Sequence, residues 1–156
     1  MTTTNHTADP LYTASDIDAM RHAEAARLPG QNRVAEIMAF ARQMGITRIG
    51  IACCISLKKE ALQLESLLSP EFEVVLIDCK TGKLDKQQLM GGSHQGIACN
   101  PSQQAQHLAE HHTQLNIAFG LCIGHDLIFN QKSTAPVTTL IVKDRQHRHH
   151  PYKTFE

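Results

Sequence analysis

Short apolar runs alternate with helical segments along most of this chain, and this alternation constrains the fold more than any other feature. The runs cover residues 48–54, 72–79, 115–122 and 136–144, and helical patterns separate them. Strands that alternate with helices form βαβ units, in which the strands run parallel and the crossovers are right-handed. The pattern therefore predicts an α/β fold, a Rossmann-like three-layer sandwich. Its mainly parallel four-stranded sheet is expected in the order 2-1-3-4, preceded by N-terminal helices.

The segment before the first run is expected to contain two helices. Ser15 is a candidate N-cap of the first, with Asp18 at the third helical position. The second is expected over residues 32–44, where apolar residues recur at helical spacing. We interpret residues 1–13 as a flexible N-terminal arm and residues 14–156 as a single α/β metal-binding domain.

Composition and charge argue against two classes of partner. Fifteen Lys and Arg residues balance fifteen Asp and Glu residues, and the chain contains no Trp. A nucleic-acid-binding surface normally shows an excess of basic residues, so we expect no nucleic-acid partner. No apolar run approaches the ~20 residues that cross a bilayer, and no signal-peptide pattern is visible. We therefore expect no membrane association and a cytoplasmic location.

Four of the five cysteines fall on one predicted edge of the sheet. Cys54, Cys79 and Cys122 stand at the ends of the first three runs, and Cys99 lies in the loop before a predicted helix. The carboxyl ends of parallel strands meet at the edge where open α/β proteins bind ligands, so these thiols are expected to converge. The alternative is that they are small core residues. We favour that interpretation for Cys53, because neighbouring side chains on a strand face opposite sides.

The spacing of the cysteines bears on the kind of metal. Thiolates bind both zinc and iron–sulfur clusters, and cytoplasmic thiols stay reduced. Structural zinc sites usually contain short paired spacings such as Cys-x-x-Cys, and none occurs here. The separated cysteines favour a [4Fe-4S] cluster held in a crevice, with zinc as the alternative cofactor. The expected ligands are Cys54, Cys79, Cys99 and Cys122.

Some of the histidines are candidate functional residues, and others are interpreted as surface residues. His125 and Asp126 follow Cys122 closely and are candidate catalytic groups, since imidazole transfers protons near neutral pH. His125 can equally be a loop histidine at the start of a helix. His107 and His111 are interpreted as part of a solvated helix face, because the Glu of an H-E-x-x-H zinc motif is missing. No phosphate-binding glycine motif follows the first run, so ordinary nucleotide binding has no support.

Several motifs resemble those of a known prokaryotic family. They are Gly50-Ile-Ala-Cys-Cys-Ile55, Cys79-Lys-Thr-Gly82, Cys99-Asn-Pro101, Gly120-Leu-Cys-Ile-Gly-His-Asp126 and Ala135-Pro-Val-Thr-Thr-Leu-Ile-Val-Lys-Asp-Arg145. The family is number eighteen forty-seven in the domain-of-unknown-function series and is usually described as metal-binding proteins. The resemblance implies a role for nine residues: Cys54, Cys79, Cys99, Cys122, His125, Asp126, Asp144, Arg145 and His149.

The layout of one cysteine at each of three strand ends also resembles that of thiouracil desulfidases. Those enzymes hold a [4Fe-4S] cluster with three cysteines and leave one iron open for the sulfur of the substrate. The resemblance implies that Cys99 is either a fourth ligand or a free thiol. It also implies three core ligands: Cys54, Cys79 and Cys122.

These observations predict a metal centre for desulfidase-like sulfur chemistry or for redox chemistry. Two alternatives stay open. One is a non-enzymatic zinc-binding or sensor module, which zinc would stabilise. The other is a reactive-thiol protein that carries sulfur as a persulfide. Neither a small-molecule substrate nor a redox partner is indicated by the sequence.

Overall fold

The computed structural model describes residues 9–156. The chain divides into two compact units between Gly45 and Ile46. The first eight residues of the expected N-terminal arm lie outside the described residues. The expected division into an arm and a single domain stays a prediction.

The first unit contains two α-helices that pack against each other, α1 (Ala14–Ala26) and α2 (Arg33–Gln43). The N-cap of α1 is Thr13, so the prediction of Ser15 was wrong. The Ser/Thr-x-x-Asp pattern also occurs two residues earlier, and there both hydrogen bonds of a capping box form. The N–H of Asp16 donates to Oγ1 of Thr13 at 3.2 Å, and the N–H of Thr13 donates to Oδ2 of Asp16 at 2.8 Å.

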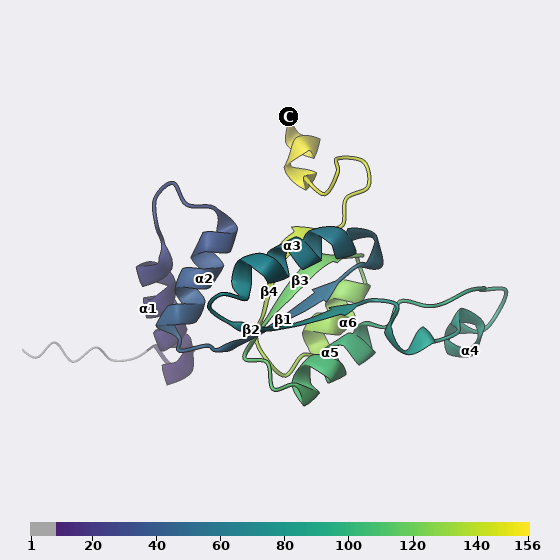
Figure 1. Cartoon of the computed structure of the whole chain (residues 1–156), viewed down its shortest axis with the longest axis horizontal. Helices are drawn as coiled ribbons and strands as arrows, with labels where there is room; N and C mark the ends of the chain where they lie inside the picture. Colours follow the sequence, from purple (N-terminus) through teal and green to yellow (C-terminus); the bar gives the residue numbers. More distant parts are fainter. Residues whose placement is uncertain (1–8) are drawn as a thin grey trace, which may run out of the picture. The chain divides into compact units, whose positions relative to one another are not determined.

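The second unit is built around a four-stranded, all-parallel sheet in the order β2-β1-β3-β4, which confirms the predicted topology (Figure 1). Every position of the central strand β3 is buried. The strands lie within the apolar runs of the sequence. They are β1 (Arg48–Cys53), β2 (Glu73–Asp78), β3 (Leu115–Leu121) and β4 (Val137–Val142).

Helices cover both sides of this sheet (Figure 1). The helix α3 (Lys58–Leu68) connects β1 to β2 and contacts both strands. The chain then reverses its direction across the sheet, so right-handed crossovers place the next helices on the opposite face. These are α5 (Pro101–Glu110) and α6 (His125–Lys132), which pack against each other.

Shorter helical segments complete the second unit. Two of them begin shortly after β1 and β2 end, at the carboxyl edge of the sheet. The segments are η1 (Ile55–Leu57), η2 (Thr81–Lys83), α4 (Lys86–Met90) and η3 (Pro151–Phe155). No helix among residues 9–156 combines the length and the apolar character needed to cross a bilayer.

A buried apolar cluster joins the sheet to α5 and α6. Two of its members from β3, Ala118 and Leu121, are three residues apart, although regular strands place every second residue on one face. Gly120 breaks the alternation: its φ is 68°, and the pairing with β4 shifts register on both sides of Phe119. The cluster consists of Ala52, Ile77, Ala105, Leu108, Ala118, Leu121 and Phe129.

Candidate functional site

Three cysteines occupy equivalent positions at the carboxyl edge of the sheet. Cys54, Cys79 and Cys122 are the first residues after β1, β2 and β3. The last pair of β1 and β2 is Cys53 with Asp78, so Cys54 and Cys79 lie at the same level. Cys54 and Cys79 are buried, at 8% and 2% exposure, and Cys122 is half-buried.

Backbone contacts bring Cys54, Cys79 and Cys99 together. The N–H of Ile55, the residue after Cys54, donates to Sγ of Cys79 at 3.3 Å. The N–H of Asn100 donates to the carbonyl oxygen of Cys79 at 2.8 Å, which places Cys99 beside it. Burial raises the pKa of Cys79 to about 12, and the neighbouring thiols of Cys99 and Cys54 add to the increase.

Cys54 has polar partners that Cys79 lacks. Its Sγ lies 3.3 Å from Oγ of Ser56, and Nζ of Lys143 donates to the same Oγ at 2.6 Å. Burial opposes ionisation of the thiol. Hydrogen bonds from Ser56 and Lys143, together with the lysine charge, outweigh burial, so the pKa of Cys54 lies below its ordinary value. Two neighbouring thiols therefore have pKa values shifted in opposite directions.

Cys122 also has a cationic partner. Nη2 of Arg145 donates to its Sγ at 3.3 Å. Arg145 and Lys143 both follow β4, so the end of the fourth strand directs cations toward thiols that follow β1 and β3. The structure thus brings Cys54, Cys79 and Cys99 together, and places Cys122 nearby at the end of the adjacent strand β3.

The predicted catalytic residues are tied to Cys122 through the backbone. The N–H groups of His125 and Asp126 both donate to the carbonyl oxygen of Cys122 at 3.0 Å. Both side chains are half-buried at the start of α6. Oδ1 of Asp126 accepts the N–H of Leu127 at 2.7 Å, while the His125 imidazole has no hydrogen-bond partner among residues 9–156.

The chain after β4 folds into a loop around Asp144. Its carboxylate accepts the N–H groups of Gln146 and His147, each at 3.0 Å, and these contacts hold its pKa below the ordinary value, the bond from His147 contributing most. The N–H of Asp144 donates to Nδ1 of His149 at 3.1 Å. Asp144 and His149 therefore order the loop that carries Arg145.

The buried side-chain amide of Gln104 binds the backbone close to the carboxyl edge of the sheet. Gln104 is fully buried on α5, and its Nε2 donates to the carbonyl oxygens of Cys53 and Ile77, each at 3.1 Å. Cys53 directly precedes Cys54, and Ile77 lies two residues before Cys79. Oε1 of Gln104 has no partner among the described residues.

Sequence reasoning assigned no role to Gln104, Ser56 or Lys143. One signal was available for Lys143, because it is the second-last residue of the predicted run 136–144, and the end of that run is expected at the ligand-binding edge. Nothing in the sequence indicated that it would reach Ser56, which is 87 positions away. For Gln104, the signal was a polar residue on the apolar face of a predicted helix.

Cys53 lies on the opposite face of β1 from Ala52, which faces α5, and it is fully buried. Burial raises its pKa to about 12, and the charge of Asp78 adds to the increase.

The donor set of the edge fits a soft metal. Thiolates are the preferred ligands of iron–sulfur clusters and zinc, and cations near them offset their negative charge. Within residues 9–156, no three His, Cys, Asp or Glu side chains lie close enough together to hold a single metal ion. The residues that would hold a cluster are those that follow the strands: Cys54, Cys79 and Cys122, with Cys99 beside them.

The fold and the edge define an α/β protein with cysteines at the carboxyl ends of three neighbouring parallel strands. Residues 3–140 match a family model described as "Protein of unknown function (DUF1847)", and the chain belongs to this family, as its motifs predicted.

A relative in Methanocaldococcus jannaschii, the uncharacterized protein MJ0455, is 43% identical over 129 residues. The alignment covers 80% of this chain and 66% of the relative, so the chain spans just under two thirds of that protein. No solved structure matches the chain.

Proposed function

We propose that this protein binds a [4Fe-4S] cluster at the carboxyl edge of its sheet. The observation that carries the proposal is that Cys54, Cys79 and Cys122 directly follow three neighbouring strands. Neighbouring strands lie ~4.8 Å apart, so these residues are distributed across the sheet. Thiolates on one zinc ion lie within about 4 Å of one another. A wider distribution suits a polynuclear cluster, in which different irons take different ligands.

Charge supports the same assignment. Arg145 donates to Sγ of Cys122, and Lys143 reaches Cys54 through Ser56. A cation beside a thiol favours the thiolate, which is the form that binds a metal. The two cations also offset the negative charge of a thiolate-bound cluster. They have this effect without acting as ligands themselves, since Lys and Arg are hydrogen-bond donors here.

Cys99 determines which chemistry the site performs. When bound through three cysteines, a cluster supplies one iron that is free to take the sulfur of a substrate, which supports desulfidase-like chemistry. With Cys99 as a fourth ligand, electron transfer or sensing is the better-supported role. In the desulfidase-like case, His125 and Asp126 are the groups beside Cys122 that hold or release protons.

Anaerobic purification and reconstitution with iron and sulfide test the proposal. We expect a brown protein that contains iron and sulfide in similar amounts. Cys54→Ala, Cys79→Ala and Cys122→Ala should each lose most of the iron. Cys53→Ala is the matched control, because Cys53 is next to Cys54 and faces the other side of the strand.

The same preparation separates the alternatives. If Cys99→Ala keeps its full iron content, three cysteines bind the cluster. If Cys99→Ala loses iron, Cys99 is a fourth ligand. A colourless protein with stoichiometric zinc after anaerobic handling would contradict the proposal and support the zinc-binding module. Iron content that is equally low in Cys53→Ala would show that the variants act through folding.

One arrangement favours a second candidate function, a sulfur carrier that uses Cys54. Lys143 and Ser56 form a hydrogen-bonded chain to Sγ of Cys54, which is typical of an activated thiolate. In this function the Cys54 thiolate attacks the outer sulfur of a donor persulfide. A new S–S bond forms at Cys54, the S–S bond of the donor breaks, and the donor leaves as a thiolate.

Limited alkylation of the metal-free protein tests this second candidate. We expect Cys54 to be modified first, and Lys143→Met to slow its modification several-fold. Lys132→Met, on α6, is a control with the same loss of charge. Slow and uniform labelling of all five cysteines would exclude a specialised thiol.

A further inference from the structure

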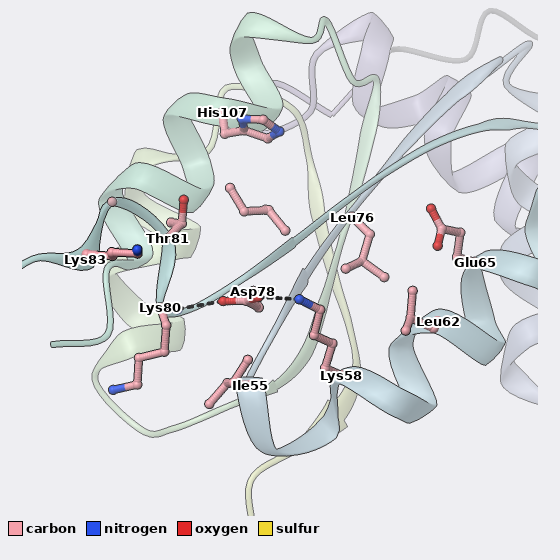
Figure 2. A pocket seen from close by; sticks show the side chains of 12 residues that line it. Ile55, Lys58, Leu62, Glu65, Leu76, Asp78, Lys80, Thr81, Lys83 and His107 are labelled. Atoms are coloured by element: carbon pink, nitrogen blue, oxygen red, sulfur yellow. Dashed lines mark hydrogen bonds and ion pairs between the residues drawn. The ribbon is translucent and has the colours of Figure 1, made fainter. Parts of the chain in front are cut away.

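A pocket of about 700 Å³ lies beside the edge strand β2, between α3, η2 and α5 (Figure 2). It is lined by residues of the second unit, and none of them is a cysteine. The pocket is therefore distinct from the thiols at the ends of the strands, although Ile55 and Asp78 border both.

The two ends of the pocket differ in chemistry. Thr81, Lys83 and His107 lie around one end, and Leu62 and Leu76 lie toward the other, where Glu65 also borders the pocket (Figure 2). The structure gives the Thr81 hydroxyl and the Lys83 ammonium no hydrogen bond or ion pair to another described residue. Both groups are therefore available to a ligand.

An ion pair separates the two ends. Nζ of Lys58 donates to Oδ2 of Asp78 at 2.8 Å, and Oδ1 of Asp78 accepts the N–H of Lys80 at 2.9 Å (Figure 2). The Asp78 carboxylate is therefore compensated, with a pKa that its partners hold below the ordinary value despite partial burial. It does not cancel the charge of Lys83.

The polar end is held in place by the fold. Gly82 has a φ of 73°, and a Cβ there would lie 3.4 Å from Nδ2 of Asn100, the N-cap of α5. The turn that carries Thr81 and Lys83 is thus packed against the start of the helix that carries His107. Burial and the neighbouring His111 lower the pKa of His107, so its ring is a neutral hydrogen-bonding group at pH 7.

We infer that this pocket binds a small organic oxyanion, a phosphate or carboxylate attached to an apolar body. The oxyanion lies at Lys83, Thr81 and His107, which offer one positive charge and two hydrogen-bonding groups. The apolar body lies against Leu76 and Leu62. Apolar walls with a few convergent polar groups are typical of small-molecule sites. The inference does not depend on the proposed cluster.

Titration of the metal-free 156-residue chain with four probes tests the inference. Calorimetry or amide NMR shifts should show that phenyl phosphate or benzoate binds at least tenfold more tightly than benzyl alcohol. Phenyl phosphate should also bind at least tenfold more tightly than inorganic phosphate. Whichever of phenyl phosphate and benzoate binds more tightly shows whether the pocket prefers a phosphate or a carboxylate.

Two variants locate the ligand. Lys83→Met should weaken binding of the preferred probe about tenfold, because a charged hydrogen bond is lost. Leu62→Ser should weaken binding of the preferred probe several-fold and leave inorganic phosphate unchanged. Lys59→Met and Leu67→Ser are controls on α3, since both residues are exposed and neither lines the pocket.

Three outcomes would overturn the inference. One is the absence of saturable binding of phenyl phosphate and benzoate. Another is inorganic phosphate or benzyl alcohol binding as tightly as the best probe, because one end of the pocket would then contribute nothing. The third is an equal loss of affinity in Lys59→Met, which would show general attraction to surface charge.

Discussion

The two adjacent cysteines at the end of the first strand show how a single position changes the chemistry of a side chain. Cys53 faces the interior, where burial raises its pKa to about 12. Cys54 is next in the chain, and its polar partners lower its pKa. The difference arises because neighbouring side chains at the end of a strand point to opposite sides, and only Cys54 reaches Ser56 and Lys143.

Gly120 is a residue at which a small change should be costly. Its φ is 68°, and an added Cβ would overlap Cδ1 of Leu57. Gly120→Ala should lower the free energy of unfolding by about 2–4 kcal/mol, from backbone strain and overpacking. Urea denaturation measures this change.

Gly30→Ala is the control for Gly120→Ala. Gly30 also has a positive φ, 76°, but a Cβ there meets nothing within 4 Å. Gly30→Ala therefore measures the cost of backbone strain alone, and it should lower the free energy of unfolding by less than Gly120→Ala does. Equal losses in the two variants would contradict the predicted overlap with Leu57.

His107 should titrate below the ordinary histidine value. Burial lowers its pKa, and the charge of His111 lowers it further. His111→Ala should therefore raise the pKa of His107, which the pH dependence of its ring NMR signals would measure. A titration midpoint that does not move, or that falls, would contradict the effect of His111.

The same shift links His107 to stability. The unfolded chain binds a proton at a higher pH than the folded chain does. As the pH falls below the ordinary histidine value of about 6.5, stability is lost until the folded pKa is passed. Above the ordinary histidine value, His107 is neutral in both the folded and the unfolded chain. There it makes no pH-dependent contribution to stability.

At the scale of elements, α5 is connected to the strand ends by Gln104. Its amide bridges the carbonyl oxygens of Cys53 and Ile77 on neighbouring strands. Gln104→Leu should lower the free energy of unfolding by about 2 kcal/mol, since buried carbonyls lose a donor. Urea denaturation tests this change.

Gln106→Leu, on the exposed face of the same helix, is the matched variant and should change stability by less than about 0.5 kcal/mol. A similar small change in Gln104→Leu would mean that the bridge contributes little.

The elements that could be predicted from the sequence are those that local patterns determine. The four apolar runs predicted the strands, and right-handed crossovers then set their order. The N-cap of α1 was misplaced because Thr13 and Ser15 head the same local pattern, and only the folded geometry distinguishes them. Partners such as Ser56 and Lys143 could not be predicted, since their contact depends on how two distant loops meet.

At the scale of the whole molecule, the order of the strands arranges the chemistry of the edge. Cysteines follow β2, β1 and β3, and cations follow β4 at one end of the sheet. The pocket lies beside β2, at the other end. Thiols therefore lie between a cationic side and a side where a small molecule is proposed to bind.

Loading of the proposed cluster should stabilise the whole second unit. A ligand that binds only the folded state raises stability, by about 2.7 kcal/mol at a hundredfold excess over its Kd. The reconstituted protein should therefore melt at least ~4 °C above the metal-free protein. Calorimetry under anaerobic conditions measures this difference.

Cys54→Ala should show no such gain in Tm after the same reconstitution, whereas Cys53→Ala should keep it. Equal melting temperatures for the reconstituted and metal-free wild-type chains would contradict binding at this edge.

The break in alternation at Gly120 has a consequence for how relatives of this chain should be aligned. β4 has an unpaired residue of its own at Leu140, and the pair Phe119–Ile141 separates it from Gly120. Loss of both residues would restore a regular ladder and keep Leu121 in the core, while drawing Cys122 back by about 3.3 Å. A paired gap at these two positions would therefore preserve the core and displace the thiol that follows β3.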